Sequence, residues 1–163
     1  MYYLSNDDVR SLEKRANEIR QSIIEMLVAA GSGHTAGPLD MAEVFALLYF
    51  SVLKHDPENP AWEERDRVVL SAGHICPVLY ATMAHAGYFP VEELATLRTF
   101  GSRLQGHPHR TALPGIETSS GPVGSGLSQA VGMALAERMD DPYTSKVIYW
   151  IGGDGVRYGG RVW

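Results

Sequence analysis

Two short apolar runs, each followed within two residues by glycine, constrain the fold of this 163-residue chain more than any other feature. The first run, 67–71, leads into Ala72-Gly73, and the second, 146–151, leads into Gly152-Gly153. A continuous apolar run is typical of a strand in a parallel sheet that is covered on both faces. Helical patterns lie before and between the two runs. The sequence therefore predicts an α/β fold, a doubly wound parallel sheet flanked by helices.

Helical periodicity accounts for much of the remaining chain. Apolar residues recur every three or four positions over 9–30, which predicts an amphipathic helix that ends at Gly31. Asp40 is expected to cap a second helix, over 41–53, whose nearly continuous apolar character predicts burial between two layers. The expected elements that follow are a polar loop over 54–65, a helix from 77 to about 86, a short helix after Pro90, a long loop over 101–124 and a helix over about 127–139.

Composition excludes several classes of protein. Hydrophobic residues make up 45% of the chain and charged residues 20%, which is too apolar for a disordered protein. The formal charge of -5 and the lack of a basic run argue against a nucleic-acid partner. The single cysteine, Cys76, excludes an intrachain disulfide. With no signal peptide and no apolar stretch long enough to cross a bilayer, we expect a cytoplasmic protein with no membrane partner.

Three of the six histidines are preceded by glycine, namely His34, His74 and His107. Glycine lets the backbone turn sharply or approach a ligand, so the histidine beside it is presented from a loop. His74 also follows a predicted strand, where open α/β sheets bind their ligands. Each histidine alone is more readily interpreted as an ordinary loop residue. Their repetition favours a shared site, and the absence of a helical His-x-x-x-His pair makes a histidine-based metal site a weak competitor.

Glycine-rich turns occur at two further places. The sequence Gly121-Pro122-Val123-Gly124-Ser125-Gly126 leads into a helix, and its backbone amides at a helix N-terminus suit a diphosphate. It is neither a Walker loop nor a dinucleotide fingerprint, and a plain flexible loop is an equally good interpretation. Asp154, within Gly153-Asp154-Gly155, is a candidate ligand for a cation that neutralises a diphosphate, although one carboxylate does not suffice. The alternative is an Asp-Gly hairpin between 148–151 and 156–158.

Several segments together resemble the N-terminal, diphosphate-binding part of transketolases, and they occur in the family order. These segments are 32–39, 66–74 with 79–80, Gly106-His107-Pro108, 115–126 with 132–134, and Gly153-Asp154-Gly155. The related synthases of deoxyxylulose phosphate share the Gly-His and Gly-Asp-Gly blocks, but Gly-His-Pro and the 121–126 loop fit transketolase better. The resemblance implies that residues 1–163 form the N-terminal part of a thiamine-diphosphate-binding domain, with the fold incomplete.

Transketolases use thiamine diphosphate and a divalent cation, Mg²⁺ or Ca²⁺, to move a two-carbon ketol unit from a ketose phosphate to an aldose phosphate. By this resemblance, His34 and His107 would contact the sugar's hydroxyls and the developing oxyanion, and His74 would lie beside cofactor and substrate. Asp154 would ligate the cation. The other cofactor contacts implied are Gly121, Pro122, Val123, Gly124, Gly153 and Gly155. The implied partners are sugar phosphates and either a second copy of the chain or a subunit with the pyrimidine-binding domain.

The sequence also departs from the family pattern. The asparagine that completes the cation shell and the glutamate that activates the cofactor's aminopyrimidine have no counterpart in these 163 residues. Gly159-Gly160-Arg161 stand where the family usually has Glu-Gly-Gln, so a glutamate at the dimer contact is replaced by Gly159. Smaller departures are Thr35-Ala36 for Pro-Gly and Ser125 for Gln. We therefore expect an incomplete fragment that needs further chain or a partner for activity; the alternative is a non-catalytic relative serving as a dimerisation or interaction module.

Overall fold

The computed structural model describes residues 3–160 and 162 and begins with a long helix, α1 (Asn6–Ala30). A capping box starts it: the Asp8 amide donates to Ser5 Oγ at 3.2 Å, and the Ser5 amide donates to Asp8 Oδ2 at 2.9 Å. The helix ends where Gly31 adopts the left-handed conformation, with φ 61°. The predicted helix over 9–30 and its stop at Gly31 are confirmed.

The next segment is three consecutive helical pieces rather than one capped helix. They are α2 (Ala36–Asp40), α3 (Ala42–Leu47) and the π-helix η1 (Leu48–Val52). The prediction that Asp40 caps a helix is wrong, because the Met41 amide donates back to Gly37 and makes Asp40 the last residue of α2. The prediction of burial between two layers is also wrong in part. Phe45 and Tyr49 are buried, whereas one side of the segment stays exposed at Val44, Leu47 and Val52.

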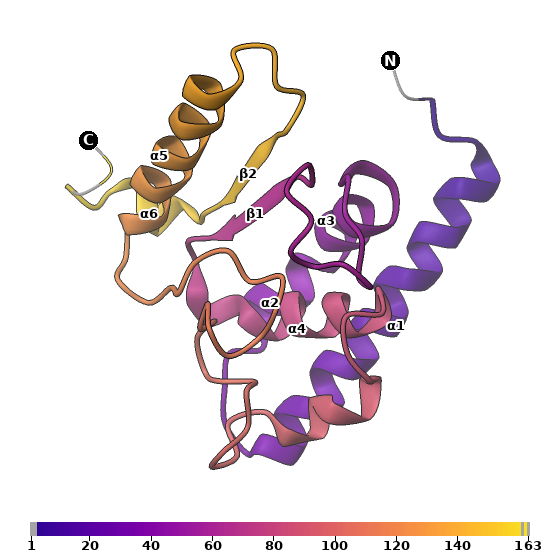
Figure 1. The fold of residues 1–163 in the computed structure, drawn as a ribbon. Coiled ribbons are helices and arrows are strands. Elements are labelled where there is room, and N and C mark those ends of the chain that lie inside the picture. Colours follow the sequence, from indigo (N-terminus) through magenta and orange to yellow (C-terminus); the bar gives the residue numbers. More distant parts are fainter. Residues whose placement is uncertain (1–2, 161, 163) are drawn as a thin grey trace.

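The two predicted strands form a parallel pair. Strand β1 (Arg67–Leu70) lies beside β2 (Ile148–Ile151), with Arg67 opposite Ile148 and Leu70 opposite Ile151. Figure 1 shows helix α5 (Ser125–Asp140) on one side of the pair and the α1–α4 layer on the other. The parallel sheet flanked by helices is therefore confirmed. The sheet is not fully covered on both faces, because every residue of β2 is partly exposed in this chain.

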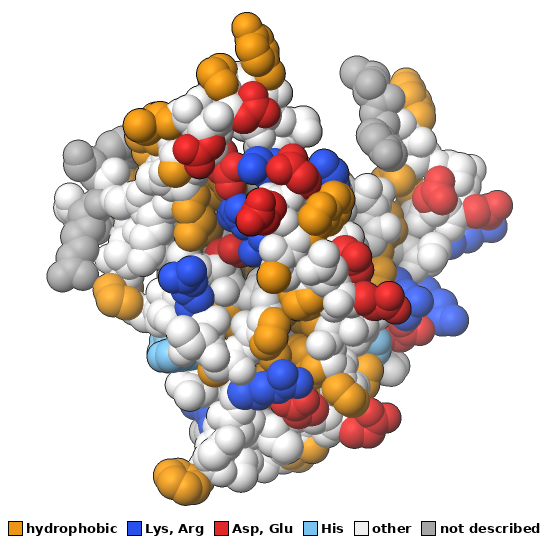
Figure 2. Space-filling model, viewed as in Figure 1, with side chains coloured by type: hydrophobic (Ala, Val, Ile, Leu, Met, Phe, Trp, Pro, Cys, Tyr) orange, Lys and Arg blue, Asp and Glu red, His pale blue; other side chains and the backbone are white. Residues whose placement is uncertain are grey.

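The start of the strand pair is joined by one buried carboxylate. Asp66 Oδ2 accepts the amide of Lys54 at 2.9 Å, and Asp66 Oδ1 accepts the amide of Val147 at 2.8 Å. Around it, Arg67 pairs with Glu137 of α5 at 2.8 Å, and Lys146 also pairs with Glu137. Figure 2 shows acidic and basic side chains gathered together on this face of the molecule. These contacts fix the loop over 54–65, both strands and the end of α5 relative to one another.

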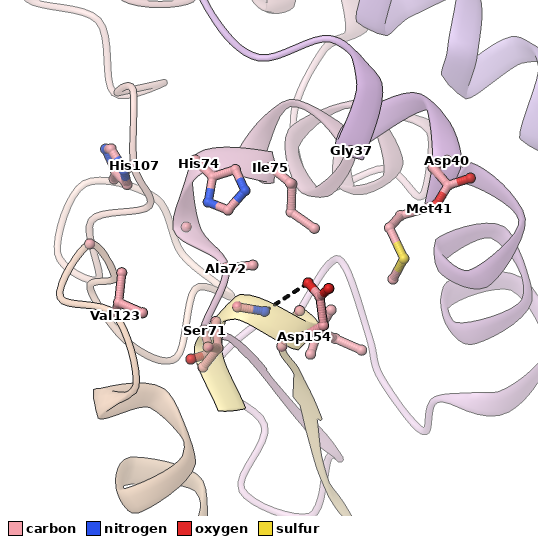
Figure 3. Close-up of a pocket in the computed structure, with 17 residues that line it drawn as sticks. Gly37, Asp40, Met41, Ser71, Ala72, His74, Ile75, His107, Val123 and Asp154 are labelled. Carbon is pink, nitrogen blue, oxygen red and sulfur yellow. Dashed lines mark hydrogen bonds between the residues drawn. The ribbon is translucent and has the colours of Figure 1, made fainter. Parts of the chain in front are cut away.

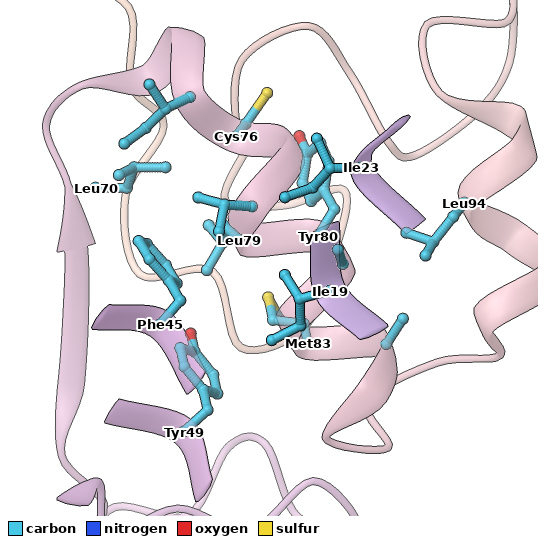
Figure 4. Close-up of a cluster of buried hydrophobic side chains, with 14 of the residues drawn as sticks. Ile19, Ile23, Phe45, Tyr49, Leu70, Cys76, Leu79, Tyr80, Met83 and Leu94 are labelled. Carbon is cyan, nitrogen blue, oxygen red and sulfur yellow. The ribbon is translucent and has the colours of Figure 1, made fainter. Parts of the chain in front are cut away.

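The main core lies where α1, α3 and α4 (Cys76–His85) meet. Figure 4 shows large side chains from these helices in contact, among them Ile19, Phe45 and Tyr80. Helix α4 follows the 3-10 turn η2 (Gly73–Ile75), is nearly all buried, and is followed by the 3-10 helix η3 (Val91–Thr96) where a short helix after Pro90 was predicted. No helix in the described residues is long and apolar enough to span a membrane.

The long loop predicted over 101–124 is confirmed, and it is fixed in place. It contains no regular helix or strand among the described residues, but Leu104, Leu113 and Ile116 are buried in the core. Its second half is held in place by Glu117, whose carboxylate pairs with Arg65 at 2.7 Å. Burial raises the pKa of the Glu117 carboxyl, and the charges of Arg65 and Arg67 oppose that rise. The loop is therefore anchored well enough to hold side chains at defined positions.

Candidate functional site

A cavity of about 610 Å³ lies at the carboxyl ends of the two strands. Ser71, Ala72 and Gly73 follow β1 into its wall, and 152–155 follow β2 into it. The remaining wall comes from the α2 region, from the loop that carries His107 and from the segment before α5 (Figure 3). Open α/β sheets bind ligands at this edge, because the loops that leave adjacent parallel strands diverge there. The fold therefore places the candidate site where the strand-glycine pattern predicted it.

Three histidines from three separate loops come together beside this cavity. The rings of His34 and His74 have centroids 5.0 Å apart, in an edge-to-face arrangement. His107 lies against the same turn, since a methyl group built on Gly73 would come within 3.0 Å of its Cδ2 atom. His74 and His107 line the cavity, whereas His34 packs against His74 and is outside the lining. Glycine before each histidine thus marked residues that are far apart in the sequence and neighbours in space.

The other histidines have structural partners elsewhere. The ring nitrogens of His55 lie 3.0 Å from the Tyr88 hydroxyl and 2.7 Å from the Tyr49 carbonyl oxygen. His85 Nε2 lies 2.9 Å from the hydroxyl of Ser22. His109 is exposed, with Nδ1 3.1 Å from the Thr111 hydroxyl. None of these three lines the cavity in the described part of the chain. The roles predicted for His34, His74 and His107 stay a prediction.

The environment of His74 favours its neutral form. Burial lowers the pKa of its imidazole below the ordinary 6.5, and the charges of His34 and His107 lower it further. A neutral imidazole both accepts and donates a hydrogen bond, depending on its tautomer. At neutral pH, His74 is therefore suited to hydrogen bonding with a polar ligand rather than to pairing with an anion.

We expect His74 to titrate below 6.5 in an NMR titration of the histidine ring signals. In the His107→Ala variant the pKa of His74 should rise, because one repelling charge is removed. The sign also sets a pH dependence of stability. The folded state binds fewer protons than the unfolded state, so stability should fall as pH drops through about 6.5. A His74 pKa that stays the same in His107→Ala would contradict the proximity of the two rings.

The glycine-rich segment before α5 reaches the cavity with only part of its length. Gly121 and Val123 line the wall, while Pro122 and Gly124 do not. The Pro122 carbonyl accepts a hydrogen bond from Ser125 Oγ at 2.9 Å, so it is turned toward the helix. Gly124 has φ 89° and turns the chain into α5. The turn thus brings the N-terminus of α5 toward the cavity, and diphosphate binding by this loop stays a prediction.

The Gly-Asp-Gly segment is a helix start and not a hairpin. The one-turn helix α6 (Asp154–Arg157) begins two residues after the end of β2, so the alternative of an Asp-Gly hairpin is wrong. Gly153, Asp154 and Gly155 all line the cavity. Asp154 Oδ1 accepts the amide of Gly155 at 2.7 Å, the contact drawn in Figure 3, and its side chain remains exposed. The Asp154 carboxylate is therefore present at the cavity with room for a further ligand.

The described residues fit a diphosphate better than they fit a complete cation shell. Ser71 and Ser120 each have a buried hydroxyl with no hydrogen-bond partner, and Ser71 lines the cavity. A polar ligand would supply a partner, and Gly153 and Gly155, with no atom within 4 Å of an added methyl position, leave room for its approach after β2. Among the described residues, no group of three His, Cys, Asp or Glu side chains could hold a metal. Asp154 would need further oxygen ligands, so these residues alone do not make a magnesium or calcium site.

Several cavity residues were not predicted as site residues from the sequence. They are Gly37, Asp40, Met41, Ser71, Ala72, Gly73, Ile75, Ile151, Gly152 and Val156. Asp40 was interpreted as a helix cap, which hid its place in the wall. Ser71 carried a usable signal, because a hydroxyl directly after a buried strand lies at the edge where ligands bind. Gly159 and Gly160, which stand where the family usually has Glu-Gly, follow α6. Arg161 and Trp163 lie outside the described residues.

Comparison with known proteins places this geometry in a family. The family model described as transketolase, thiamine diphosphate binding domain, matches residues 11–156. The 6-deoxy-6-sulfo-D-fructose transketolase subunit SqwG of Clostridium sp. is 47% identical over 152 residues, which are 93% of this chain and 54% of that protein. Transketolase of Buchnera aphidicola is 44% identical over 140 residues, or 85% of this chain and 21% of that protein.

Solved structures agree with the sequence comparisons. Transketolase from Leishmania mexicana superimposes with a TM-score of 0.85 at 37% identity, covering 91% of this chain and 24% of that one. Transketolase from Campylobacter jejuni gives a TM-score of 0.84 at 36% identity, again over 91% of this chain and 24% of that one. The chain thus spans about half the length of the sulfo-sugar relative and a fifth to a quarter of the other three. With its parallel strand pair, its glycine-lined cavity and these matches, the chain belongs to the transketolase family through its thiamine diphosphate binding domain.

Proposed function

We propose that this chain forms the diphosphate-binding side of a transketolase-type active site, in which a two-carbon ketol unit passes from a ketose phosphate to an aldose phosphate. Further chain or a partner subunit would complete the site with the pyrimidine-binding domain and the remaining cation ligands. The observation that supports this most is the meeting of His34, His74 and His107 beside a cavity at the strand ends.

The cavity offers two chemically distinct regions for such a reaction. The backbone amide of Gly153, the Ser71 hydroxyl and the start of α5 suit the diphosphate. Asp154 would contribute one oxygen to an Mg²⁺ or Ca²⁺ ion between the phosphates and the protein. In Figure 3, His74 lies between Asp154 and His107. The diphosphate and the reacting sugar thus have separate sets of partners.

Each histidine has a defined role in this proposal. Thiamine diphosphate, when bound, supplies the carbanion chemistry that makes and breaks the carbon-carbon bond. His74 and His107 would donate hydrogen bonds to sugar oxygens, where negative charge develops as the reaction proceeds. His34 touches His74 edge-on and is assigned to the outer hydroxyls of the sugar. These roles require hydrogen-bond donors of fixed position, which the anchored 101–124 loop and the η2 turn provide.

Calorimetric titration with thiamine diphosphate in the presence of Mg²⁺ tests the proposal. We expect weak binding to residues 1–163, because Asp154 alone leaves the cation shell incomplete. Gly153→Val should abolish this binding while the protein stays folded. Gly153 lines the cavity, has an ordinary φ of -86°, and has no atom within 4 Å of its added methyl position, so the fold itself does not oppose a side chain there.

A variant of α5, Gly132→Ala, serves as the control for that titration, since it also adds a methyl group in open space. It should bind as the parent does. Tight, stoichiometric binding to residues 1–163 would contradict the incomplete cation shell. Equal binding by the parent and Gly153→Val would remove the cavity from the proposed function.

The names of the relatives support a proposal for the substrate class. Sugar phosphates are the expected substrates of a transketolase. The relative named for 6-deoxy-6-sulfo-D-fructose adds a sulfonated sugar as a second candidate, at 47% identity. Both are ketoses that end in a tetrahedral anionic group. We propose that the substrate of the completed enzyme is a sugar with such an anionic terminus.

An exposed apolar stripe on α5 supports association with another chain. Val131, Leu135 and Met139 recur at every fourth position and are all exposed, Met139 at 83%. Figure 2 shows hydrophobic side chains on this outer surface. Exposed apolar patches of this kind mark protein contacts. The stripe suits either a second copy of the chain or a pyrimidine-domain subunit, and it equally suits the alternative of a non-catalytic interaction module.

We expect sedimentation velocity to show concentration-dependent self-association of the chain, because the stripe on α5 is uncovered. Leu135→Glu should shift the protein toward the monomer by placing a charge in the middle of the stripe. Val28→Glu is the matched control, since Val28 is 76% exposed but lies on α1. A clean monomer at high concentration, or equal effects of the two variants, would contradict an association surface on α5.

A further inference from the structure

Helix α5 is held to the rest of the chain by little apolar contact. Only Gly126 and Ala130 are buried among its 16 residues, whereas nine of the ten residues of α4 are buried. Figure 1 shows α5 beside the strand pair, on the side away from the α1–α4 layer. A helix that buries so little surface gains little free energy from packing, so its position depends on a few specific contacts.

The two ends of α5 are attached to the two ends of β1. At the N-terminal end, Gly126 lies close against Ser71, since a methyl group built on it would come within 2.8 Å of the Ser71 Cα atom. Near the other end, Glu137 Oε1 accepts hydrogen bonds from Arg67 Nη2 at 2.8 Å and from Arg67 Nε at 3.2 Å. Arg67 is the first residue of β1, and Ser71 directly follows its last residue. The helix therefore runs antiparallel to the strand and is fixed at both ends.

Glu137 also joins α5 to the second strand. Its Oε2 atom pairs with Lys146, which lies two residues before β2. This pairing lowers the pKa of the Glu137 carboxyl and raises the pKa of the Lys146 ammonium, so both groups are charged at neutral pH. The side chain of Glu137 is only 13% exposed. One nearly buried carboxylate thus holds the helix to both strands.

Removing the Glu137 carboxylate would leave neither cation uncompensated. Arg67 Nη1 lies 3.8 Å from Glu117 Oε2, and Lys146 Nζ lies 3.8 Å from Glu64 Oε1. Neither Glu117 nor Glu64 belongs to α5. The strands therefore keep their charged partners without Glu137, and the change releases the C-terminal end of α5 rather than unfolding the chain.

We propose that Glu137 is a positioning residue for the cavity, which fixes the N-terminus of α5 at the cavity wall from the opposite end of the helix. Gly126 and Glu137 are 11 residues apart, or about 16 Å along a helix. A helix attached at both ends cannot tilt about the Ser71 contact, whereas a helix attached only there can. The direction of its N-terminal amides is then fixed relative to the cavity, as binding of a diphosphate requires. This inference rests on the proposed function, since it names a residue outside the cavity that shapes the diphosphate side of that site.

The first test is amide hydrogen exchange of the 163-residue chain, followed by NMR without any ligand. We expect Glu137→Ala to speed exchange in α5 by about tenfold or more, the usual effect of losing a hydrogen bond to a charged group. Amides of α1 and α4 should keep the rates of the parent. The signals of Ser71 and Gly126, at the other end of the helix, should shift. Glu137→Gln should fall between the parent and Glu137→Ala, because its amide oxygen still accepts from Arg67 but carries no charge.

Glu93→Ala is the matched control for the exchange experiment. Glu93 also accepts two hydrogen bonds from one arginine, Arg103, but this pair joins η3 to the loop that follows it. Its removal should leave exchange in α5 unchanged. Parent-like exchange in α5 of Glu137→Ala would show that Glu137 is dispensable, and equal acceleration in α5 and α1 would show a general stabilising role. Either result would overturn the proposal.

The second test is a titration of the same proteins with inorganic pyrophosphate in the presence of Mg²⁺, followed through the amides of Gly126 and Gly153. Glu137→Ala should weaken binding by about threefold or more, because the binding-competent position of α5 is then only fractionally populated. Glu93→Ala should bind as the parent does. Parent-like affinity of Glu137→Ala would overturn the proposal even if its α5 exchanged faster.

The two tests separate this inference from the proposed function. A parent chain that binds no pyrophosphate would remove the diphosphate site of the proposed function. The exchange rates of α5 and the signals of Ser71 and Gly126 would still decide whether Glu137 positions the helix. Pyrophosphate binding that does not depend on Glu137 would leave the proposed function standing and remove the positioning role.

Discussion

Replacing His107 with alanine is expected to lower the turnover of ketol transfer by about a hundredfold to a thousandfold in the completed enzyme, the usual loss of one oxyanion-stabilising donor. The affinity for thiamine diphosphate should change little, because His107 lies on the far side of His74 from Asp154 (Figure 3). A donor that acts mainly on the developing charge lowers the turnover number and leaves cofactor binding nearly unchanged. Steady-state kinetics of residues 1–163 combined with the remaining domains, together with cofactor titration, measures both effects.

His109→Ala is the matched control for this experiment. His109 lies two residues along the same loop, is exposed and hydrogen bonds only locally, to Thr111. His55 and His85 are poorer controls than the sequence indicates, because each is half-buried and hydrogen-bonded within the fold. Equal turnover of His107→Ala and His109→Ala would show that the glycine-histidine pattern is structural. The assignment of His34, His74 and His107 to the substrate would then be abandoned.

Two glycines of α5 should respond in opposite ways to the same change. A methyl group on Gly126 would lie 2.6 Å from Ser71 Cβ and 2.8 Å from the Ser71 backbone Cα, so helix and strand end must move apart. We expect Gly126→Ala to destabilise the fold by about 1–3 kcal/mol, the usual cost of overpacking. Gly132→Ala meets nothing within 4 Å and should stabilise by about 0.5–1 kcal/mol through helix propensity.

Urea unfolding of the two variants measures this difference as a shift of the midpoint at constant slope. The comparison has a functional side, since Ser71 lines the cavity and Gly126 fixes how closely α5 approaches it. If Gly126→Ala were as stable as Gly132→Ala, the close contact of α5 with the end of β1 would be wrong. The position of the helix N-terminus at the cavity would be wrong with it.

The elements of this fold that the sequence predicts are those with a local signature. The runs at 67–71 and 146–151 predicted a parallel pair, and the register of β1 with β2 confirms it. The stop at Gly31 follows from a left-handed conformation that glycine adopts easily. In the segment over 41–53 almost every residue is apolar, so periodicity could not show which face is exposed. Contact with α1 and α4 decides that, and it leaves Val44 and Val52 in solvent.

The residues of the candidate site also divide into those with a local sequence signature and those without one. Glycine before histidine is a local pattern, and it found His74 and His107 without any knowledge of their proximity. Asp40 was assigned to a helix cap because an acidic residue before an apolar run has that meaning in most sequences. Its place in the cavity wall depends on how α2 packs beside η2, which no local pattern encodes. The hairpin alternative at Asp154 failed for a related reason, since the same dipeptide begins a helical turn when it follows a parallel strand.

The hydrogen bond between Asp66 and Val147 has a consequence for the order of folding. It joins residues 81 positions apart, and the whole β1–β2 pairing spans a similar separation. Closing so long a loop costs conformational entropy before it gains contacts, so such pairings form late. The layer of α1, α3 and α4 has shorter-range contacts and its own core, and should collapse first. One wall of the cavity belongs to the helical layer, and the other belongs to the part of the chain with β2 and α5. The cavity is therefore complete only when β2 and α5 dock in the final step.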